Sequence, residues 1–258
     1  MQTVILAGGL GTRIAGEGNN LPKPMVYIGG QPILWHIIKY YSAFGFYEFI
    51  ICCGYKGHMI KEYFADYYLH RSDITFDFSN NNRMTVHSNV AEPWKVTLVD
   101  TGGGSQTGGR VRRIKKYVGD NPFFLTYGDG VSNIDLNSLL DYHKEQGSTV
   151  TISAVQPGGR FGVLDFNERG AVSGFREKAQ EDGGWINAGF MVMEPEIFDY
   201  LDGDSCVLEN EPFWRLSQEG KMAAYRHYDY WQCMDTQRDR GFLEQRWQND
   251  NAPWRIWD

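Results

Sequence analysis

Strand-like and helix-like segments alternate along the first 155 residues, and this alternation limits the folds that the chain can adopt. Five apolar runs are predicted to form buried strands: Thr3–Leu6, Glu48–Cys53, Lys95–Val99, Phe123–Tyr127 and Thr149–Val155. The predicted helices lie between them: Pro32–Phe44, His58–Tyr68, Gly108–Val118 and Leu136–Gln146. Because parallel strands need crossover connections, this order is typical of an α/β fold with a mostly parallel sheet and helices on its faces.

The remaining segments depart from this alternation. Ile74–Phe78 and Met84–Ser88 flank the Asn-rich sequence SNNNR, so they are predicted to form a hairpin. The strands after residue 160 are short, and we interpret them as a small antiparallel extension of the same body: Gly162–Phe166, Val172–Arg176 and Ile186–Met193. Helices are expected near Pro195–Leu201, near Glu211–Gln218 and from Thr236 to Trp247. No linker rich in Pro, Gly or Ser divides the chain, so we expect a single domain over residues 1–258.

The composition narrows the range of partners. The net charge of −7 argues against a nonspecific nucleic-acid binder, which needs a basic face. None of the four cysteines forms a CxxC pair, and Cys52 and Cys53 lie in an apolar run, so we expect buried reduced thiols. No signal segment and no apolar run of about 20 residues is visible, which favours a cytoplasmic protein without a membrane partner.

A glycine-rich loop, GGLGTR at Gly8–Arg13, directly follows the first predicted strand. It does not match the dinucleotide fingerprint GxGxxG, because Ile14 stands where the third glycine belongs. It does not match the P-loop GxxxxGK[ST] either, because Glu17 stands where the lysine belongs. Glycines let backbone N–H groups approach an anion, and Thr12 and Arg13 add a hydroxyl and a bidentate cation. The composition therefore favours a phosphate-binding loop, with an ordinary glycine turn as the alternative.

Lys23 lies between two prolines in the segment PKPM. A following proline disfavours the helical conformation, so Lys23 is predicted to be extended. The preceding proline restricts the chain further, and the ammonium group would then point at one fixed place. The alternative is an ordinary lysine on the surface.

The segments LAGGLGTR and PKPM resemble the signature of the sugar-1-phosphate nucleotidyltransferases. Further segments along nearly the whole chain are similar to the glucose-1-phosphate cytidylyltransferase branch of that family: FIICCGYKG, EPWKVTLVDTG, TGGRVRRI, TYGDGV, GRFGVLDF, INAGF and MDTQRD. The stretches CCGYKG, TLVDTG and TGGR, with APW near the C-terminus, point to this branch over the thymidylyl, uridylyl and adenylyl branches.

The resemblance implies a fold, a reaction and a set of partners. The expected fold is a Rossmann-like α/β/α sandwich with a mixed, mostly parallel sheet. Residues 1–155 would mainly bind the nucleotide, and residues 156–258 mainly the sugar phosphate. CTP and a sugar 1-phosphate are the expected substrates, Mg²⁺ is the expected cofactor, and a homo-oligomer is the expected assembly. Because the sugar phosphate attacks the α-phosphorus directly, the reaction needs charge neutralisation and alignment rather than a catalytic Ser, a catalytic Cys or a general base.

Two aspartates are candidates for the metal site. Asp129 follows a predicted strand within TYGDG, and Asp235 precedes Thr236 at a predicted helix start. The resemblance implies that both hold Mg²⁺, which binds one or two carboxylates together with substrate phosphates. From the residues alone, Asp235 could instead be a helix-start residue next to an N-cap, and Asp129 could belong to an Asp-Gly hairpin turn. The hairpin turn is less favoured, because no partner strand follows at once.

The remaining site residues are assigned by the resemblance. Arg13 and Lys23 are expected to contact the phosphates of CTP, and Lys178 the phosphate of the sugar; with the two aspartates they form the expected catalytic set. The candidates for nucleotide binding are Leu6, Gly8, Gly9, Gly11, Thr12, Arg13, Lys23, Thr107, Gly108, Arg110 and Gly128. The candidates for sugar-phosphate binding are Tyr127, Gly162, Glu177, Lys178 and Asn187. Arg110 would donate to the cytosine carbonyl, whereas Glu177 and Lys178 could equally form a solvated ion pair.

The sequence departs from the family pattern in IAGEGNNL after the glycine loop, at Ala179 and at Ala188. The last two positions lie near the expected sugar site, so a cytidylyltransferase with another phosphorylated acceptor is a second hypothesis. A catalytically silent nucleotide-sugar-binding subunit is a third. Trp254 and Trp257 lie in the C-terminal tail, and we expect them to pack on the chain's own fold or on a neighbouring subunit.

Overall fold

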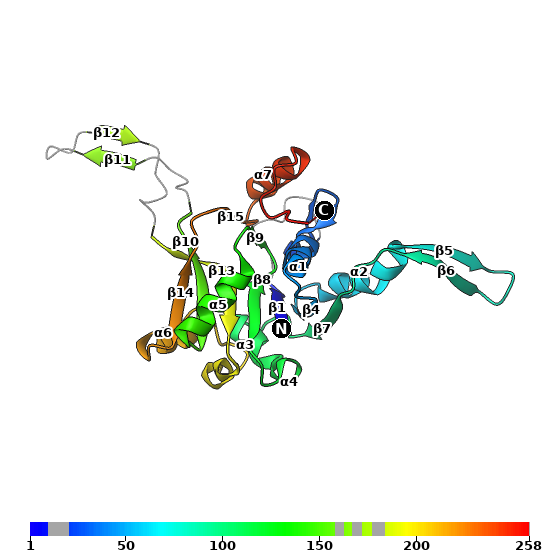
Figure 1. The fold of residues 1–258 in the computed structure, drawn as a ribbon, viewed down its shortest axis with the longest axis horizontal. Coiled ribbons are helices and arrows are strands. Elements are labelled where there is room, and N and C mark those ends of the chain that lie inside the picture. The colour runs from blue at the N-terminus through cyan, green and yellow to red at the C-terminus, as the bar shows by residue number, and fades with distance from the viewer. Residues whose placement is uncertain (10–20, 158–162, 167–171, 177–183, 258) are drawn as a thin grey trace.

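Seven strands form one central sheet in the computed structural model, which describes residues 1–9, 21–157, 163–166, 172–176 and 184–257 (Figure 1). In order across the sheet they are β14 (Met222–Arg226), β10 (Val150–Val155), β13 (Ile186–Met193), β8 (Phe123–Tyr127), β1 (Gln2–Ala7), β4 (Glu48–Cys53) and β7 (Lys95–Asp100). Neighbouring strands are parallel except that β13 runs antiparallel to both β10 and β8. The predicted mixed, mostly parallel sheet is therefore confirmed.

Strand β13 occupies a place that the sequence analysis did not predict. The sequence places Ile186–Met193 in a peripheral extension, whereas in the structure Val192 pairs with Phe124 on one side and with Thr151 on the other. The last six residues of β13 are all buried, because a central strand is covered on both faces. Of the three strands predicted for the extension, β11 (Val163–Phe166) and β12 (Val172–Arg176) pair with each other in a separate two-stranded antiparallel sheet.

Helices cover both faces of the sheet, as the predicted sandwich requires. One hydrophobic cluster joins Ile5 of β1 to the first set of helices, and a second cluster joins Val4 and Leu6 of the same strand to the second set. The first set is α1 (Ile33–Ala43), α2 (Gly57–His70), α5 (Leu136–Gln146) and α7 (Gln237–Gln248). The second set is α3 (Thr107–Arg113), α4 (Lys115–Val118), the 3₁₀ helix η3 (Pro195–Tyr200) and α6 (Glu211–Gln218). Successive side chains of a strand point to opposite faces, so β1 contributes to both cores.

Local sequence signals explain several helix boundaries. Helix α5 begins after Asp135, whose carboxylate accepts the Ser138 N–H at 2.9 Å, and it ends at Gly147, which has φ +60°. The predicted helix Gly108–Val118 is divided in the structure, because Ile114 leaves the helical conformation between α3 and α4. Pro32 precedes α1 instead of lying in its first turn.

The remaining strands form short ladders and one long hairpin. Strands β5 (Ser72–Asp77) and β6 (Arg83–Asn89) confirm the predicted hairpin, which extends from the end of α2 away from the sheet (Figure 1). The short ladders pair β2 (Tyr27–Ile28) with β3 (Gln31–Pro32), and β9 (Gly130–Ser132) with β15 (Trp231–Cys233). Cys52 and Cys53 are buried free thiols, as expected. Within the described ranges, every helix is too short or too polar to cross a bilayer.

The C-terminal tail packs on the chain's own fold. Trp254 is only 1% exposed and stacks on Tyr230, with ring centroids 5.8 Å apart. Trp257 meets the edge of Trp35 at 5.8 Å. This confirms the expectation that the tail packs on the chain's own fold.

His36 lies under this tail and leads to a prediction about pH. Its Nε2 lies 2.8 Å from the Ile28 carbonyl and its Nδ1 lies 3.4 Å from the Trp254 indole nitrogen, so a neutral imidazole satisfies both contacts. Burial lowers the pKa of His36 from 6.5 to about 4. Because the unfolded chain binds this proton at a higher pH than the folded chain, the free energy of unfolding should fall as the pH decreases from 6.5 to about 4.

Urea denaturation of the wild type and of His36→Gln, at about pH 7.5 and about pH 4.5, measures this contribution. The wild type should lose more stability on acidification than the variant. An equal loss in both proteins would contradict the assignment of the titrating group.

Candidate active site

A short ladder outside the main sheet brings Asp129 and Asp235 together. Asp129 follows β8 and precedes β9, in which Gly130 pairs with Cys233 of β15. The Asp129 carbonyl accepts the Met234 N–H at 2.8 Å, which places the next residue, Asp235, beside Asp129. Since β9 pairs with β15 and not with β8, the Asp-Gly hairpin turn is excluded for Asp129.

Thr236, and not Asp235, caps helix α7. The Thr236 side chain accepts the Asp239 N–H at 3.2 Å, and the Asp239 carboxylate accepts the Thr236 N–H at 2.9 Å, which completes a capping box. The Asp239 carboxylate also accepts the backbone N–H of Asp235 at 3.1 Å. The Thr236 and Asp239 side chains thus cap the helix start, and the Asp235 carboxylate contacts the Lys23 ammonium.

The Lys23 ammonium lies between the two carboxylates. Its Nζ is 2.6 Å from Asp129 Oδ2 and 2.5 Å from Asp235 Oδ1, and the lysine side chain is 14% exposed. Burial lowers the pKa of Lys23, but the two carboxylates outweigh this effect and raise the pKa above its usual value. Both carboxylates therefore point at one position, which a positive charge occupies.

The conformation predicted for Lys23 is wrong. Lys23 begins a 3₁₀ helix, η1 (Lys23–Met25), instead of being extended. The Met25 N–H donates to the Pro22 carbonyl at 2.8 Å and the Val26 N–H donates to the Lys23 carbonyl at 3.1 Å. These two turn hydrogen bonds outweigh the local preference of a residue before proline. Pro22 is the extended residue, with φ −65° and ψ +147°.

A cavity of about 200 Å³ lies at the C-terminal ends of β1 and β8, where ligands commonly bind in open α/β sheets. The following predicted site residues line it: Leu6, Gly8, Gly9, Lys23, Thr107, Arg110, Tyr127, Gly128 and Asp129. The structure thus brings together residues from the first glycine loop, from η1, from α3 and from the end of β8.

Arg110 is held by acceptors of the protein itself. Its guanidinium donates to the Gly8 carbonyl at 2.9 Å, to Thr101 Oγ1 at 2.8 Å and to the Gly102 carbonyl at 2.9 Å. A Cβ atom on Gly8 would lie 2.1 Å from Arg110 Nη1, so Gly8 is required for this close contact. The contact of Arg110 with cytosine stays a prediction, and these bonds show that Arg110 also fixes the glycine loop.

Gly108 and Gly109 allow the start of α3 to pack closely against the segment that contains Asp204 and Cys206. A Cβ atom on Gly108 would lie 2.6 Å from the Cys206 sulfur, and one on Gly109 would lie 2.5 Å from the Asp204 carbonyl oxygen. The sequence analysis names Gly108 as a candidate for nucleotide binding, and this role stays a prediction. In the structure, the segment before α6 fills the space next to α3.

Tyr127 and Asn187, both predicted to bind the sugar phosphate, lie side by side. The Asn187 amide donates to the Tyr127 hydroxyl at 3.4 Å, and the Tyr127 hydroxyl donates to Glu209. Gly189 has φ +83°, and a Cβ atom there would lie 2.4 Å from the Tyr127 ring. The sequence analysis missed Glu209 and Gly189; a glycine inside a buried strand run was the available signal for Gly189, whereas no pattern marked Glu209.

A half-buried thiol, that of Cys233, lies next to the carboxylates. Cys233 Sγ lies 3.6 Å from Asp235 Oδ2. Burial raises the pKa of Cys233 to about 12, and Asp235 and Asp129 contribute to the increase. The protonated thiol agrees with chemistry that needs no covalent intermediate with the enzyme.

Some predicted site residues lie outside the described residues. They are Gly11, Thr12, Arg13, Gly162, Glu177 and Lys178. Their roles stay predictions, as does the alternative of a solvated ion pair for Glu177 and Lys178.

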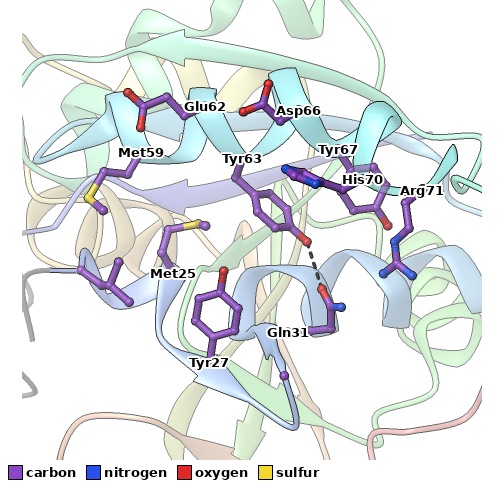
Figure 2. Close-up of a pocket in the computed structure, with 12 residues that line it drawn as sticks. Met25, Tyr27, Gln31, Met59, Glu62, Tyr63, Asp66, Tyr67, His70 and Arg71 are labelled. Atoms are coloured by element: carbon purple, nitrogen blue, oxygen red, sulfur yellow. Dashed lines mark hydrogen bonds between the residues drawn. The ribbon is translucent and has the colours of Figure 1, made fainter. Parts of the chain in front are cut away.

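A second cavity, of about 500 Å³, lies between α2 and the segment around β2 and β3. Figure 2 shows Tyr63 extending from α2 towards Gln31, to which its hydroxyl donates at 3.2 Å. Met25 lines this cavity, whereas Lys23 of the same 3₁₀ helix lines the smaller one. Among the predicted site residues that the structure describes, none lines the larger cavity, so the cavity with the converging charges is the candidate active site.

Comparison with known proteins supports a common family. The chain matches the Nucleotidyl transferase family model over residues 2–232. It is 52% identical to the glucose-1-phosphate cytidylyltransferase of Salmonella typhi and 42% identical to the probable glucose-1-phosphate cytidylyltransferase of Bacillus subtilis, covering 100% of both chains in each comparison. The resemblance seen in the sequence motifs is therefore confirmed.

Solved structures show the same fold. HddC from Yersinia pseudotuberculosis aligns with a TM-score of 0.69 at 24% identity, covering 95% of this chain and 99% of that chain. An apo UDP-glucose pyrophosphorylase aligns with a TM-score of 0.69 at 14% identity, covering 96% and 98%. The fold, the arrangement of charges at the strand ends and the family model agree, and the chain belongs to the nucleotidyl transferase family.

Proposed function

We propose that the protein transfers the cytidylyl group of CTP to α-D-glucose 1-phosphate and releases CDP-glucose and diphosphate. The observation that carries the proposal is the convergence of Lys23, Asp129 and Asp235 at the ends of the strands, in a chain 52% identical over its full length to a glucose-1-phosphate cytidylyltransferase. Leu6, Gly8, Thr107 and Tyr127, four of the residues assigned to the substrates, line the cavity of about 200 Å³ that Lys23 and Asp129 also line.

The reaction joins two anions in a single displacement. An oxygen of the sugar phosphate forms a bond to the α-phosphorus of CTP, while the bond from that phosphorus to the oxygen bridging to the β-phosphate breaks. The electron pair of the broken bond leaves with diphosphate, and no proton transfer is needed. A lysine is charged at neutral pH, so Lys23 would provide an ammonium group near the reacting phosphates.

Mg²⁺ fits the residues that are present. Asp129 and Asp235 each direct one carboxylate oxygen at the position of the Lys23 ammonium, so both can face a cation. No cluster of three or more potential metal ligands occurs among the residues that the structure describes, which suits an ion that completes its shell with substrate phosphates and water. When bound, Mg²⁺ would supply positive charge to the phosphate oxygens as negative charge develops on them. Asp129 and Asp235 are the residues that would hold it.

A pyrophosphate-release assay tests the proposal. CTP, UTP, dTTP and ATP are each offered with a panel of sugar 1-phosphates in the presence of Mg²⁺. We expect release with CTP and glucose 1-phosphate. Activity only with UTP or dTTP would contradict the cytidylyl assignment, preference for another acceptor would support the second hypothesis, and no release with any pair would favour a silent binding subunit.

Replacing Lys23 with alanine should lower kcat by roughly 10²–10³, because one preorganised cation is lost where charge develops. Steady-state kinetics with CTP and glucose 1-phosphate give kcat and KM separately. Lys116→Ala is the matched control, since Lys116 is exposed on α4. If KM rose while kcat stayed constant, Lys23 would bind ground state and transition state equally, contrary to the prediction.

We also propose, from the resemblance, that the chain forms a homo-oligomer in the cytoplasm. The exposed aromatic side chains on the β5–β6 hairpin support a protein contact there, since Phe76 is 52% and Phe78 is 78% exposed. Sedimentation velocity measures the assembly, and a monomer at micromolar concentration would contradict it.

A further inference from the structure

Glu209 lies behind the candidate site and connects two of its walls. Its Oε2 accepts the Thr107 hydroxyl at 2.5 Å, and its Oε1 accepts the Tyr127 hydroxyl. Thr107 and Tyr127 line the 200 Å³ cavity, whereas Glu209 does not. No Lys, Arg or His of the described ranges forms an ion pair with Glu209, so hydroxyl donors from two different elements satisfy this carboxylate.

The directions of these hydrogen bonds are determined by chemistry. A carboxylate only accepts, so both hydroxyls must donate to Glu209. The Tyr127 oxygen then accepts the Asn187 amide at 3.4 Å, and the Thr107 oxygen accepts the Leu208 N–H at 2.9 Å. One continuous chain of hydrogen bonds therefore links Asn187 on β13 to the start of α3.

The segment that carries Glu209 is attached to α3 by its backbone. The Gln106 N–H donates to the Asp204 carbonyl at 2.8 Å, and the Gly109 N–H donates to the Cys206 carbonyl at 3.1 Å. The glycines at the start of α3 permit this packing, because any Cβ atom there would collide with the segment. Glu209 is thus held against α3 and reaches from there to the end of β8.

We propose that Glu209 is a positioning residue that couples the nucleotide side of the site, through Thr107, to the acceptor side, through Tyr127 and Asn187. This inference rests on the proposed function, which assigns the two sides. Glu209 acts on the substrates only through the hydroxyls that it orients. A substitution there should therefore affect the binding of both substrates, although Glu209 touches neither.

Glu209→Gln provides the test, because it keeps the size of the side chain and replaces one acceptor with a donor. The variant should raise KM for both CTP and glucose 1-phosphate, with kcat/KM about tenfold lower or more, the effect expected for a lost hydrogen bond to a charged group. Tyr127→Phe should raise mainly the KM for glucose 1-phosphate, and Thr107→Val mainly the KM for CTP. Glu211→Gln, exposed at the start of α6, is the matched control and should be unchanged.

Double variants separate positioning from a general structural effect. In the Tyr127→Phe background, Glu209→Gln should no longer change the KM for glucose 1-phosphate, since the hydroxyl through which it acts is absent. Wild-type constants in Glu209→Gln, or an undiminished effect in that background, would overturn the inference. If Glu209→Gln fails to fold, the combined Tyr127→Phe/Thr107→Val variant must reproduce both KM increases, and normal KM values there would overturn the inference.

The same experiment distinguishes failure of this inference from failure of the proposed function. If the wild type releases no diphosphate with CTP and glucose 1-phosphate, the proposed function fails. Calorimetric binding of CTP then replaces turnover as the readout. Glu209→Gln should weaken CTP binding in the wild-type background and leave it unchanged in the Thr107→Val background; the same weakening in both would overturn the inference.

Discussion

Replacing Asp129 or Asp235 with asparagine is expected to lower kcat by at least about 10³, equivalent to roughly 4 kcal/mol of transition-state stabilisation. Each change removes the negative charge from one of the two carboxylates that converge on the position of the Lys23 ammonium. An amide oxygen is a weaker ligand for Mg²⁺, so the site can no longer hold the charge that the phosphates need. The measurement is steady-state diphosphate release at saturating Mg²⁺ and saturating substrates.

Two controls accompany these variants. Asp199→Asn, exposed on η3, changes a carboxylate outside the site and should keep the wild-type kcat. The double variant of Asp129 and Asp235 should be little slower than either single variant, because residues that act as a unit are not additive. A normal kcat in either single variant, with the fold intact by circular dichroism, would refute the assignment of these aspartates.

Replacing Trp254 with alanine should lower the free energy of unfolding by about 3–5 kcal/mol, the usual effect of removing a buried large aromatic side chain. Trp254 belongs to the hydrophobic cluster that also contains Ile5 and Ile37, and it stacks on Tyr230. Its indole nitrogen donates to His36 at 3.4 Å, so the change also leaves a buried imidazole nitrogen without this donor.

Urea denaturation measures this loss of stability. Trp214→Ala is the matched control, because Trp214 lies on α6 with 63% of its surface exposed. The control should change the free energy of unfolding by no more than about 0.5 kcal/mol. If both variants lost the same free energy, the tail would not contribute to the core as the structure indicates.

The elements that the sequence predicts well are those with strong local signals. Glu48–Cys53 and Phe123–Tyr127 are continuous apolar runs, and the structure forms strands with the same boundaries. Leu136–Gln146 lies between an Asp cap and a terminal glycine, and the observed helix has the same boundaries. Buried parallel strands and capped helices can be read from the sequence because their signals lie within one segment.

Non-local pairing is less accessible from the sequence. The central position of β13 depends on its pairing with β8 and β10, and nothing within Ile186–Met193 indicates which neighbours it has. Strand β14 (Met222–Arg226), at the edge of the sheet, was not predicted either, because its pairing with β10 is also non-local. Lys23 shows a further limit, because the hydrogen bonds of η1 outweigh the conformational preference imposed by Pro24.

The candidate site was predicted where the residues carry a recognisable family motif. Asp129, Lys23 and Asp235 were identified in this way, and the structure brings them together. Glu209 has no such motif, and its significance depends on two hydroxyls from distant elements. Motifs therefore identified the residues that carry charge, and only the structure revealed the side chain that connects them.

The β9–β15 ladder also bears on how such a protein can diversify. The chain leaves the site at Ser132 and re-enters it at Trp231, and these two residues pair with each other in the ladder. The Ser132 hydroxyl and the Asn133 N–H both donate to the Tyr230 carbonyl, at 2.7 and 3.2 Å, which closes the junction. The two ends of residues 133–230 therefore adjoin at this ladder, and the segment between them contributes β10, β13 and β14 to the central sheet. Loop changes within that segment that leave the ladder intact should therefore keep the spacing of Asp129 and Asp235.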